Sequence, residues 1–242
     1  MSKKTDSNGY TITFAIVMVV IVGSILAFFA SSLKPNINEN KRIEKQQNIL
    51  YAMGVKDKSS ANFVSTTIAG EKFKKHITEQ LVLTSENGEV TKVQTRDEYM
   101  AENNNQEPYL IDIKKQKSNA KDGKSRKLPL FVGENKDGKK FYVAPIYGKG
   151  LWDAIWGYVS MDEDMIVQGA YFDHKGETPG LGANIKQPYF MDDFTGEHLM
   201  SKDGVFKGIT VAKGNNDPKN DIKDDYEVDA LAGATITGDG VS

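Results

Sequence analysis

Cysteine is absent from the 242 residues of the sequence. Its absence excludes disulfides, thiolate zinc sites, cysteine-ligated iron–sulfur clusters and a lipid anchor on an N-terminal cysteine. Histidine is scarce, and the three histidines are too far apart in the sequence to match the spacing of metal ligands. We therefore expect no metal site and only structural or surface roles for His76, His174 and His198.

The sequence also lacks a dominant charge and the common motifs of nucleotide chemistry. The 31 Lys and Arg residues are balanced by 33 Asp and Glu residues, so a nucleic-acid partner is not indicated. Neither a GxGxxG motif at the start of a helix nor a Walker motif is present. No nucleophile–base pair is recognisable either, so an enzyme that acts on its own is the least expected class.

One segment, residues 11–30, is apolar and free of charge. About twenty such residues in a helix span the hydrocarbon core of a membrane and pair their own backbone groups there. A cleaved signal peptide is the alternative, but the run exceeds the roughly 7–15 apolar residues of such peptides and no Ala-x-Ala site follows it. We predict an N-terminal tip over residues 1–10 and a retained transmembrane helix over 11–30. Lysines flank both ends of the run, so charge leaves its orientation open.

The part that follows, residues 31–127, is expected to contain helices and loops. Pro35 and its polar neighbours predict the end of the first helix. Phe73, Ile77 and Leu81 recur at helical spacing, which predicts a further helix. The expected elements are helices over 39–53 and 70–83, a short strand over 109–113 and a basic loop over 114–127.

Residues 128–242 have the alternating apolar pattern and tight turns of β structure. Neighbouring strands with short connections favour an antiparallel sheet over a doubly wound one. The prediction is therefore an α+β fold: one N-terminal transmembrane helix, then a single soluble domain with a mainly antiparallel sheet flanked by helices. The expected strands are 128–134, 140–147, 153–161, 165–173 and 205–212, the first two joined by an Asp-Gly connection over 135–139.

The C-terminal segment Asp229–Ser242 carries two threonines among small residues. Its first seven residues resemble the flavinylation motif of proteins that carry FMN on a threonine through a phosphoester, in which an Asp and three further residues precede Gly-Ala-Thr. A Ser or Thr usually stands where this chain has Ala232. The competing interpretation is a turn into a C-terminal strand or helix. On the motif, Thr235 is the acceptor and Thr237 the fallback.

Two further clusters are candidates for binding a planar ligand. The loop 174–184 contains three glycines and a proline, so its backbone N–H groups are available to an anion, and Glu177 and Thr178 suit the polar edge of a ligand. In the segment 147–153, Trp152 suits a planar ring and Lys149 a phosphate. A plain strand-to-helix turn and core aromatics are the respective alternatives.

These clusters occur with a basic tip, one apolar span and a helix ending in Tyr51-Ala-Met-Gly54. Together they resemble the C subunit of the bacterial Na+-translocating NADH:quinone oxidoreductase over nearly the whole chain. The related G subunit of the Rnf ferredoxin-linked complex is the alternative, since it shares the glycine-rich loop and the Gly-Ala-Thr segment. The other motifs in the resemblance are Ala120-Lys-Asp-Gly-Lys124, Leu128-Pro-Leu-Phe-Val132, Gly148-Lys-Gly-Leu-Trp152 and Gly176-Glu-Thr-Pro-Gly-Leu-Gly182.

The resemblance implies FMN covalently attached to Thr235 by a Mg2+-dependent flavin transferase that uses FAD. It also implies a relay of single electrons within a six-subunit NADH:quinone reductase, with the soluble domain on the outer (periplasmic) face of the cytoplasmic membrane. A redox-silent accessory subunit and an anchored extracytoplasmic binding module without covalent flavin remain alternatives. Members of the family usually continue for a turn or more of helix beyond Gly240-Val241. The residues expected to bind FMN are Thr235, Ala234, Asp229, Glu177, Thr178, Gly180, Leu181, Gly182, Lys149 and Trp152; Asp229 is a recognition residue for the transferase or a partner of the loop.

Overall fold

The computed structural model describes residues 7–57, 63–134, 138–214, 217 and 219–242. The chain divides into two compact units, Met1–Arg42 and Ile43–Ser242. The first unit consists of the greater part of one long helix. The second contains the sheet, the remaining helices and the end of that long helix.

The long helix, α1 (Asn8–Ala52), contains the apolar run of the sequence. Its apolar side chains within the first unit are exposed, and the helix is long and apolar enough to cross a membrane. The prediction of a helix over 11–30 is confirmed. The prediction of a separate helix over 39–53 is wrong, because α1 continues through Pro35. Proline removes one backbone hydrogen bond from a helix, and here the helical turns on both sides of that residue persist.

The second unit is built on a six-stranded antiparallel sheet in the order β2-β1-β3-β4-β5-β6. This confirms the predicted α+β fold with a mainly antiparallel sheet. A short parallel pair, β7 and β8, lies outside the sheet. The strands are β1 Ile77–Glu86, β2 Glu89–Thr95, β3 Arg126–Glu134, β4 Lys140–Lys149, β5 Ala154–Met161, β6 Val167–His174, β7 Thr210–Ala212 and β8 Glu227–Asp229.

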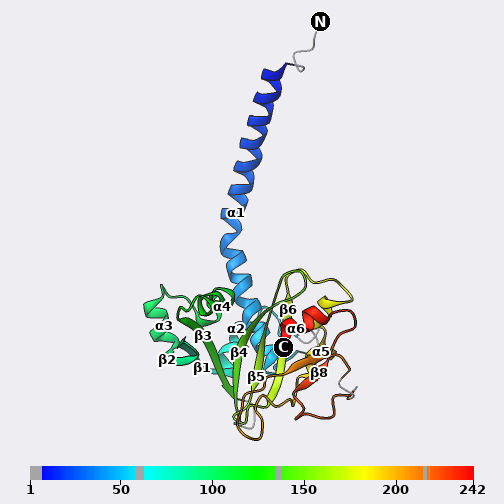
Figure 1. Cartoon of the computed structure of the whole chain (residues 1–242). Helices are drawn as coiled ribbons and strands as arrows, with labels where there is room; N and C mark the ends of the chain where they lie inside the picture. Colours follow the sequence, from blue (N-terminus) through cyan, green and yellow to red (C-terminus); the bar gives the residue numbers. More distant parts are fainter. Residues whose placement is uncertain (1–6, 58–62, 135–137, 215–216, 218) are drawn as a thin grey trace. The chain divides into compact units, whose positions relative to one another are not determined.

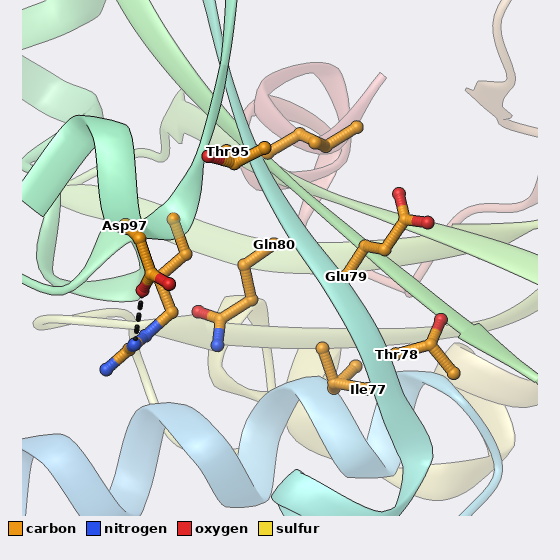
Figure 2. Close-up of a pocket in the computed structure, with 8 residues that line it drawn as sticks. Ile77, Thr78, Glu79, Gln80, Thr95 and Asp97 are labelled. Carbon is orange, nitrogen blue, oxygen red and sulfur yellow. Dashed lines mark hydrogen bonds and ion pairs between the residues drawn. The ribbon is translucent and has the colours of Figure 1, made fainter.

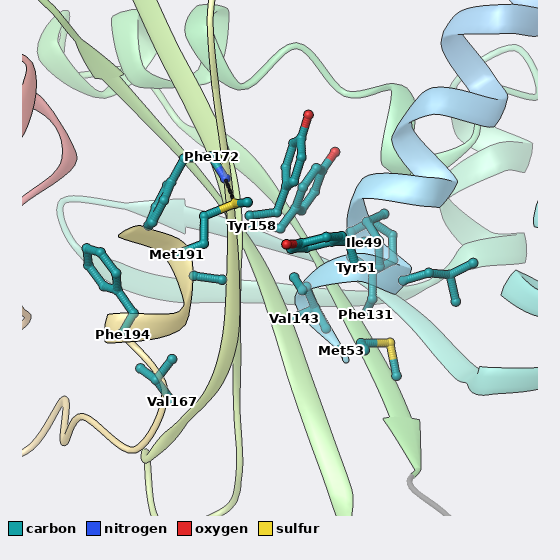
Figure 3. Packing of buried hydrophobic residues seen from close by; sticks show 14 of the residues in the cluster. Ile49, Tyr51, Met53, Phe131, Val143, Tyr158, Val167, Phe172, Met191 and Phe194 are labelled. Atoms are coloured by element: carbon teal, nitrogen blue, oxygen red, sulfur yellow. Dashed lines mark hydrogen bonds between the residues drawn. The ribbon is translucent and has the colours of Figure 1, made fainter. Parts of the chain in front are cut away.

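The hydrophobic core lies against the sheet and includes the end of α1 (Figure 3). Ile49 of α1 packs with Phe131 of β3 and Val143 of β4, and none of the three side chains has exposed surface. Toward the β6 edge, Phe172 and Phe194 meet edge to face with their ring centroids 4.8 Å apart. This packing fixes the β5–β6 pair, from which the candidate site extends.

The remaining helices lie around the sheet (Figure 1). In that view α3 lies near β2, whereas α5, α6 and β8 lie on the side of β6. The helices are α2 Ala69–His76, α3 Arg96–Glu102, α4 Ile113–Lys121, α5 Pro188–Asp193 and α6 Thr235–Val241, with 3-10 turns η2 Pro108–Leu110 and η3 Gly182–Lys186.

Several predictions between residues 70 and 127 are corrected by the structure. The helix predicted over 70–83 ends at His76, and the rest of that segment is β1, which pairs with both β2 and β3. Residues 109–113 form no strand, and the basic segment predicted as a loop contains α4. The capping box of Thr95 and Glu98 begins α3, which the sequence analysis missed.

The strand predictions after residue 127 are closer to the structure. Strands β3 to β6 begin and end within two residues of the predicted bounds. Of the strand predicted over 205–212, Thr210–Ala212 form β7, and Phe206 makes an isolated bridge with Met200. The predicted connection over 135–139 lies partly outside the described residues.

Candidate functional site

The two candidate threonines occupy opposite environments on α6. Thr235 is the first residue of the helix and is exposed, whereas Thr237 has only 1% of its surface exposed. The chain enters the helix through Gly233, which has a positive φ of 71°, and through buried Ala234. The side chain of Thr235 is therefore accessible at the start of a short, tightly packed helix.

Glu177 lies at the centre of the site and is buried. Its carboxylate accepts a 2.5 Å hydrogen bond from the Thr237 hydroxyl and a 2.9 Å bond from the backbone N–H of Trp152. The backbone N–H groups of Leu151 and Asp153 donate to the same carboxylate at 3.3 and 3.4 Å. Burial acts to raise the pKa of Glu177, but these hydrogen bonds outweigh it and lower the pKa. An ionised carboxylate thus joins the loop after β6, the loop after β4 and α6.

Close backbone approach makes two glycines of this site necessary. A Cβ atom on Gly182 would lie 2.5 Å from the Thr237 hydroxyl oxygen and 2.6 Å from a carboxylate oxygen of Glu177. A Cβ atom on Gly148 would lie 1.8 Å from the carbonyl oxygen of Gly240. The glycines that marked these loops in the sequence therefore permit α6 to lie directly against the loop after β6 and the end of β4.

Exposed apolar side chains surround the start of α6. The indole N–H of Trp152 donates to the Thr178 hydroxyl at 3.1 Å, and 68% of the surface of Trp152 remains exposed. Leu181 is 42% exposed and lies against Gly233, where an added Cβ would meet it at 2.9 Å. Ile236 is 54% exposed. This rim offers a planar ligand an apolar surface close to the Thr235 hydroxyl.

The structure therefore brings together most of the residues selected from the sequence. Glu177, Thr178, Leu181, Gly182 and Trp152 are joined to one another or to α6 by the contacts above. Gly180 has a φ of 78° at the turn of the same loop.

Asp229 and Lys149 lie at the ends of strands. Asp229 is the last residue of β8, where it pairs with Ala212, which places it before the turn that leads into α6. Lys149 ends β4, and its carbonyl lies against Gly240 while its exposed side chain lines a separate pocket.

Two features of the site were not predicted from the sequence. The bonds of Thr237 and of the Leu151 and Asp153 amides to Glu177 join segments far apart in the chain, so no local pattern indicates them. Three lysines predicted to lie in a loop belong instead to α4: Lys114, Lys117 and Lys121, which line the same pocket as Lys149. The basic run 114–127 was the available signal.

A different concave surface lies at the other end of the sheet, between β1 and α3 (Figure 2). Arg96 lines this surface, and its guanidinium group donates to Asp97 and to both carboxylate oxygens of Glu107. The charge of Arg96 is thus already neutralised within the domain. Within the described parts of the chain, no group of His, Asp and Glu residues has the arrangement of a metal site.

The comparisons with known proteins agree with this geometry. Residues 150–242 match the family model of the FMN-binding domain. This range includes the loop after β6 and all of α6. The fold, the site and this match place residues 150–242 in the class of FMN-binding domains.

The relatives are similar over nearly the whole chain. The chain is 31% identical to the C subunit of the Na+-translocating NADH-quinone reductase of Neisseria meningitidis serogroup A, an alignment that covers 100% of this chain and 90% of that protein. The corresponding protein of Pasteurella multocida is 29% identical with the same coverage. The chain therefore belongs to the family formed by the C subunits of Na+-translocating NADH-quinone reductases.

Solved structures support the same assignment. The crystal structure of the C subunit from Parabacteroides distasonis aligns with a TM-score of 0.65 and 32% identity, covering 86% of this chain and 89% of that one. Shewanella oneidensis NqrC aligns with a TM-score of 0.60 and 27% identity, covering 84% and 88%.

Proposed function

We propose that the chain is an electron-transfer subunit that carries FMN on Thr235 through a phosphoester bond. The observation that carries this proposal is the contrast between the two hydroxyls of α6: that of Thr235 is exposed, whereas that of Thr237 is buried and donates to Glu177. A hydroxyl must be accessible to a transferase in order to be modified.

The residues around Thr235 fit an attached flavin. Trp152 and Leu181 offer exposed apolar surface to a planar ring, and Thr178 holds the indole of Trp152 in place. Glu177 acts as a positioning residue, since its inward-directed carboxylate fixes the loops that carry this surface. When bound, FMN would supply one-electron chemistry, and the protein would supply position and surroundings. No general acid, base or nucleophile of this chain takes part in the electron transfer itself.

The maturation step requires a separate flavin transferase that uses FAD. The Thr235 Oγ would attack the phosphorus of the FMN half, the bond to the AMP half would break, and the hydroxyl proton would be released. A covalent bond is advantageous outside the cytoplasm, where a dissociated cofactor would be lost. The apolar helix α1 is consistent with a single-pass membrane anchor, and we place the domain on the outer face of the cytoplasmic membrane.

The reductase of the relatives indicates the wider function. Within a six-subunit membrane complex, the chain would pass single electrons between neighbouring subunits while the complex oxidises NADH, reduces quinone and transports Na+. Its partners would be those subunits, the transferase and membrane lipid.

The direct test is expression with the flavin transferase, followed by fluorescence on a denaturing gel. Wild type and Thr237→Val should show a fluorescent band, and Thr235→Val should show none. A band that survives in Thr235→Val but disappears in Thr237→Val would assign the attachment site to Thr237 instead. An unmodified intact mass for the wild type would favour a binding module without covalent flavin.

The relay is tested separately, in the assembled complex. Loss of quinone reduction by NADH in the Thr235→Val complex, with all subunits present, is the expected result. Full activity without the fluorescent band would assign the chain an accessory role.

A further inference from the structure

Beside the candidate flavin site lies a second concave surface, which we call the lysine pocket. It encloses about 350 Å³ between α4 and the end of β4. Lys114, Lys117 and Lys121 of α4 line it together with Lys149 of β4. Four lysines thus line one small pocket of a chain whose net charge is -2.

The positive charge of the lysine pocket is offset only in part within the described parts of the chain, by the charge of Asp153, which lies within electrostatic reach of Lys114. Its lining acid, Asp153, forms an ion pair with Lys175 at 2.8 Å and also accepts from the N–H of Ala154. Lys114 and Lys121 are exposed and make neither a hydrogen bond nor an ion pair with the described residues. Their charge is therefore directed to solvent or to another molecule.

The shape of the pocket is held by a contact between its two walls. Lys117 Nζ donates to the backbone carbonyl of Tyr147 at 2.8 Å and lies 6.0 Å from the centre of the Tyr147 ring. This contact joins α4 to β4, so the lysines of the helix are presented from one side and Lys149 from the other.

The lysine pocket and the candidate flavin site share Trp152. Trp152 lines the pocket, while its backbone N–H donates to Glu177 and its ring N–H to Thr178. A molecule seated in the pocket would therefore contact the residue that also borders the flavin.

We propose that the lysine pocket docks the acidic face of the protein that exchanges electrons with the flavin. This inference rests on the proposed function. Redox partners meet over small interfaces, and opposite charges speed and orient their approach. An exposed tryptophan at the rim suits a protein surface, because aromatic residues are enriched in interfaces. The partner is thus expected to present carboxylates around an apolar centre.

The test uses the intact membrane complex and follows the flavin absorbance after rapid mixing with NADH. In the wild type, the rate of electron exchange should fall as ionic strength rises, because salt screens exposed charges. The double variant Lys114→Glu, Lys121→Glu should react about tenfold more slowly at low ionic strength and lose most of the salt dependence. Lys114→Arg, Lys121→Arg should behave like the wild type, since both charges remain.

The matched control is Lys72→Glu, Lys75→Glu on α2. It makes the same change of charge at residues that do not line the pocket. If the Lys114, Lys121 variant keeps the rate and salt dependence of this control, the docking surface is refuted. Should that variant fail to assemble, Lys114→Gln, Lys121→Gln provides the same comparison with an expected loss of about threefold.

Two further readouts separate this inference from its alternatives. A wild type without the fluorescent band would refute the proposed function. A normal band, with a rate of electron exchange that the substitutions at Lys114 and Lys121 do not change, would refute the docking surface alone. Pyrophosphate at constant ionic strength should slow the wild type by competing with the partner. Saturable binding of pyrophosphate that leaves the rate unchanged would assign the pocket to a small anion instead.

Discussion

The hydroxyl of Thr237 donates a 2.5 Å hydrogen bond to the carboxylate of Glu177, which is 60 residues away in the sequence. This bond joins α6 to the loop after β6 within the buried part of the domain. It gives the neighbouring threonines separate roles: Thr237 holds the helix in place, and Thr235 is accessible.

The first prediction concerns the variant Thr237→Val. Valine keeps the shape of threonine but removes the donor, so one oxygen of Glu177 loses its hydroxyl partner. The free energy of unfolding in denaturant should fall by about 1–2 kcal/mol, while the fluorescent flavin band persists. Thr178→Val is the control, because its hydroxyl is exposed and its loss should change stability by less than about 0.5 kcal/mol. Equal stability of the two variants would contradict the structural role of Thr237.

The second prediction concerns the charge of Glu177. Hydrogen bonds lower its pKa below 4.5, so its ionised form stabilises the folded state. That contribution is present above pH 4.5 and is lost as the pH falls through the folded pKa. Near neutral pH, Glu177→Gln should lower the free energy of unfolding by about 1–3 kcal/mol, because the amides of residues 151–153 lose a charged acceptor.

The pH dependence provides the check on Glu177. The stability difference between wild type and Glu177→Gln should shrink in acid, as the wild-type carboxyl becomes neutral. Urea titrations at several pH values measure it, with the exposed Glu86→Gln as control. A difference that stays constant into acid would show that the charge does not contribute.

The third prediction concerns the contact between Gly148 and Gly240. A Cβ atom on residue 148 would lie 1.8 Å from a backbone carbonyl, and backbone yields less readily than a side chain. Gly148→Ala should therefore cost about 2–4 kcal/mol of stability and reduce the yield of flavinylated protein, because α6 is displaced. Gly176→Ala, where nothing lies within 4 Å, should be close to neutral. Thermal unfolding and the intensity of the flavin band report the two effects.

Strands β3 to β6 follow from the sequence because their pattern is local. Each is a short apolar-rich run bounded by turn residues, and each pairs with a neighbour along the chain. β1 also pairs with its neighbour along the chain, β2, but it was predicted as part of a helix. Its residues Ile77 and Leu81 continue the helical spacing that begins at Phe73. It nevertheless belongs to the sheet, because it pairs with β3, which lies about fifty residues further along the chain. Pairing over such a distance is not encoded in a local window.

Helix α4 was not predicted for a different reason. α4 has no buried residue, so its sequence lacks an amphipathic pattern, and its available signal is the cap in which Asp112 accepts from the N–H of Lys115. The motifs at the candidate site were recognisable because they need glycines and small residues. The inward direction of Glu177 was not recognisable, because its partners come from two segments far from it in the sequence, residues 151–153 and Thr237.

The last prediction concerns Glu197, which is fully buried beside the loop that precedes β8. Asn220 donates to one carboxylate oxygen at 3.0 Å, and Lys223 lies 3.4 Å from the same oxygen. The other oxygen has no hydrogen-bond partner among the described residues. Burial raises the pKa of Glu197 to about 7; Asn220 and Lys223 act against this shift, and the charge of Asp225 adds to it.

The sign of the pH effect at Glu197 is opposite to that at Glu177. Between pH 4.5 and about 7 the folded state holds a proton that the unfolded state has released, so stability falls as the pH rises through this range. From about pH 5 to about pH 8 this group should remove on the order of 1–3 kcal/mol from the free energy of unfolding. Glu197→Gln stays neutral and should abolish that loss.

Urea unfolding of wild type and Glu197→Gln at a series of pH values measures this difference. The control is Glu163→Gln, an exposed carboxyl in the turn between β5 and β6, which should leave the pH profile of the wild type unchanged. The variant at residue 197 should be as stable as the wild type near pH 5 and more stable near pH 8. If instead Glu197→Gln is less stable at pH 8, the ion pair with Lys223 outweighs burial, and the carboxyl is ionised in the native protein.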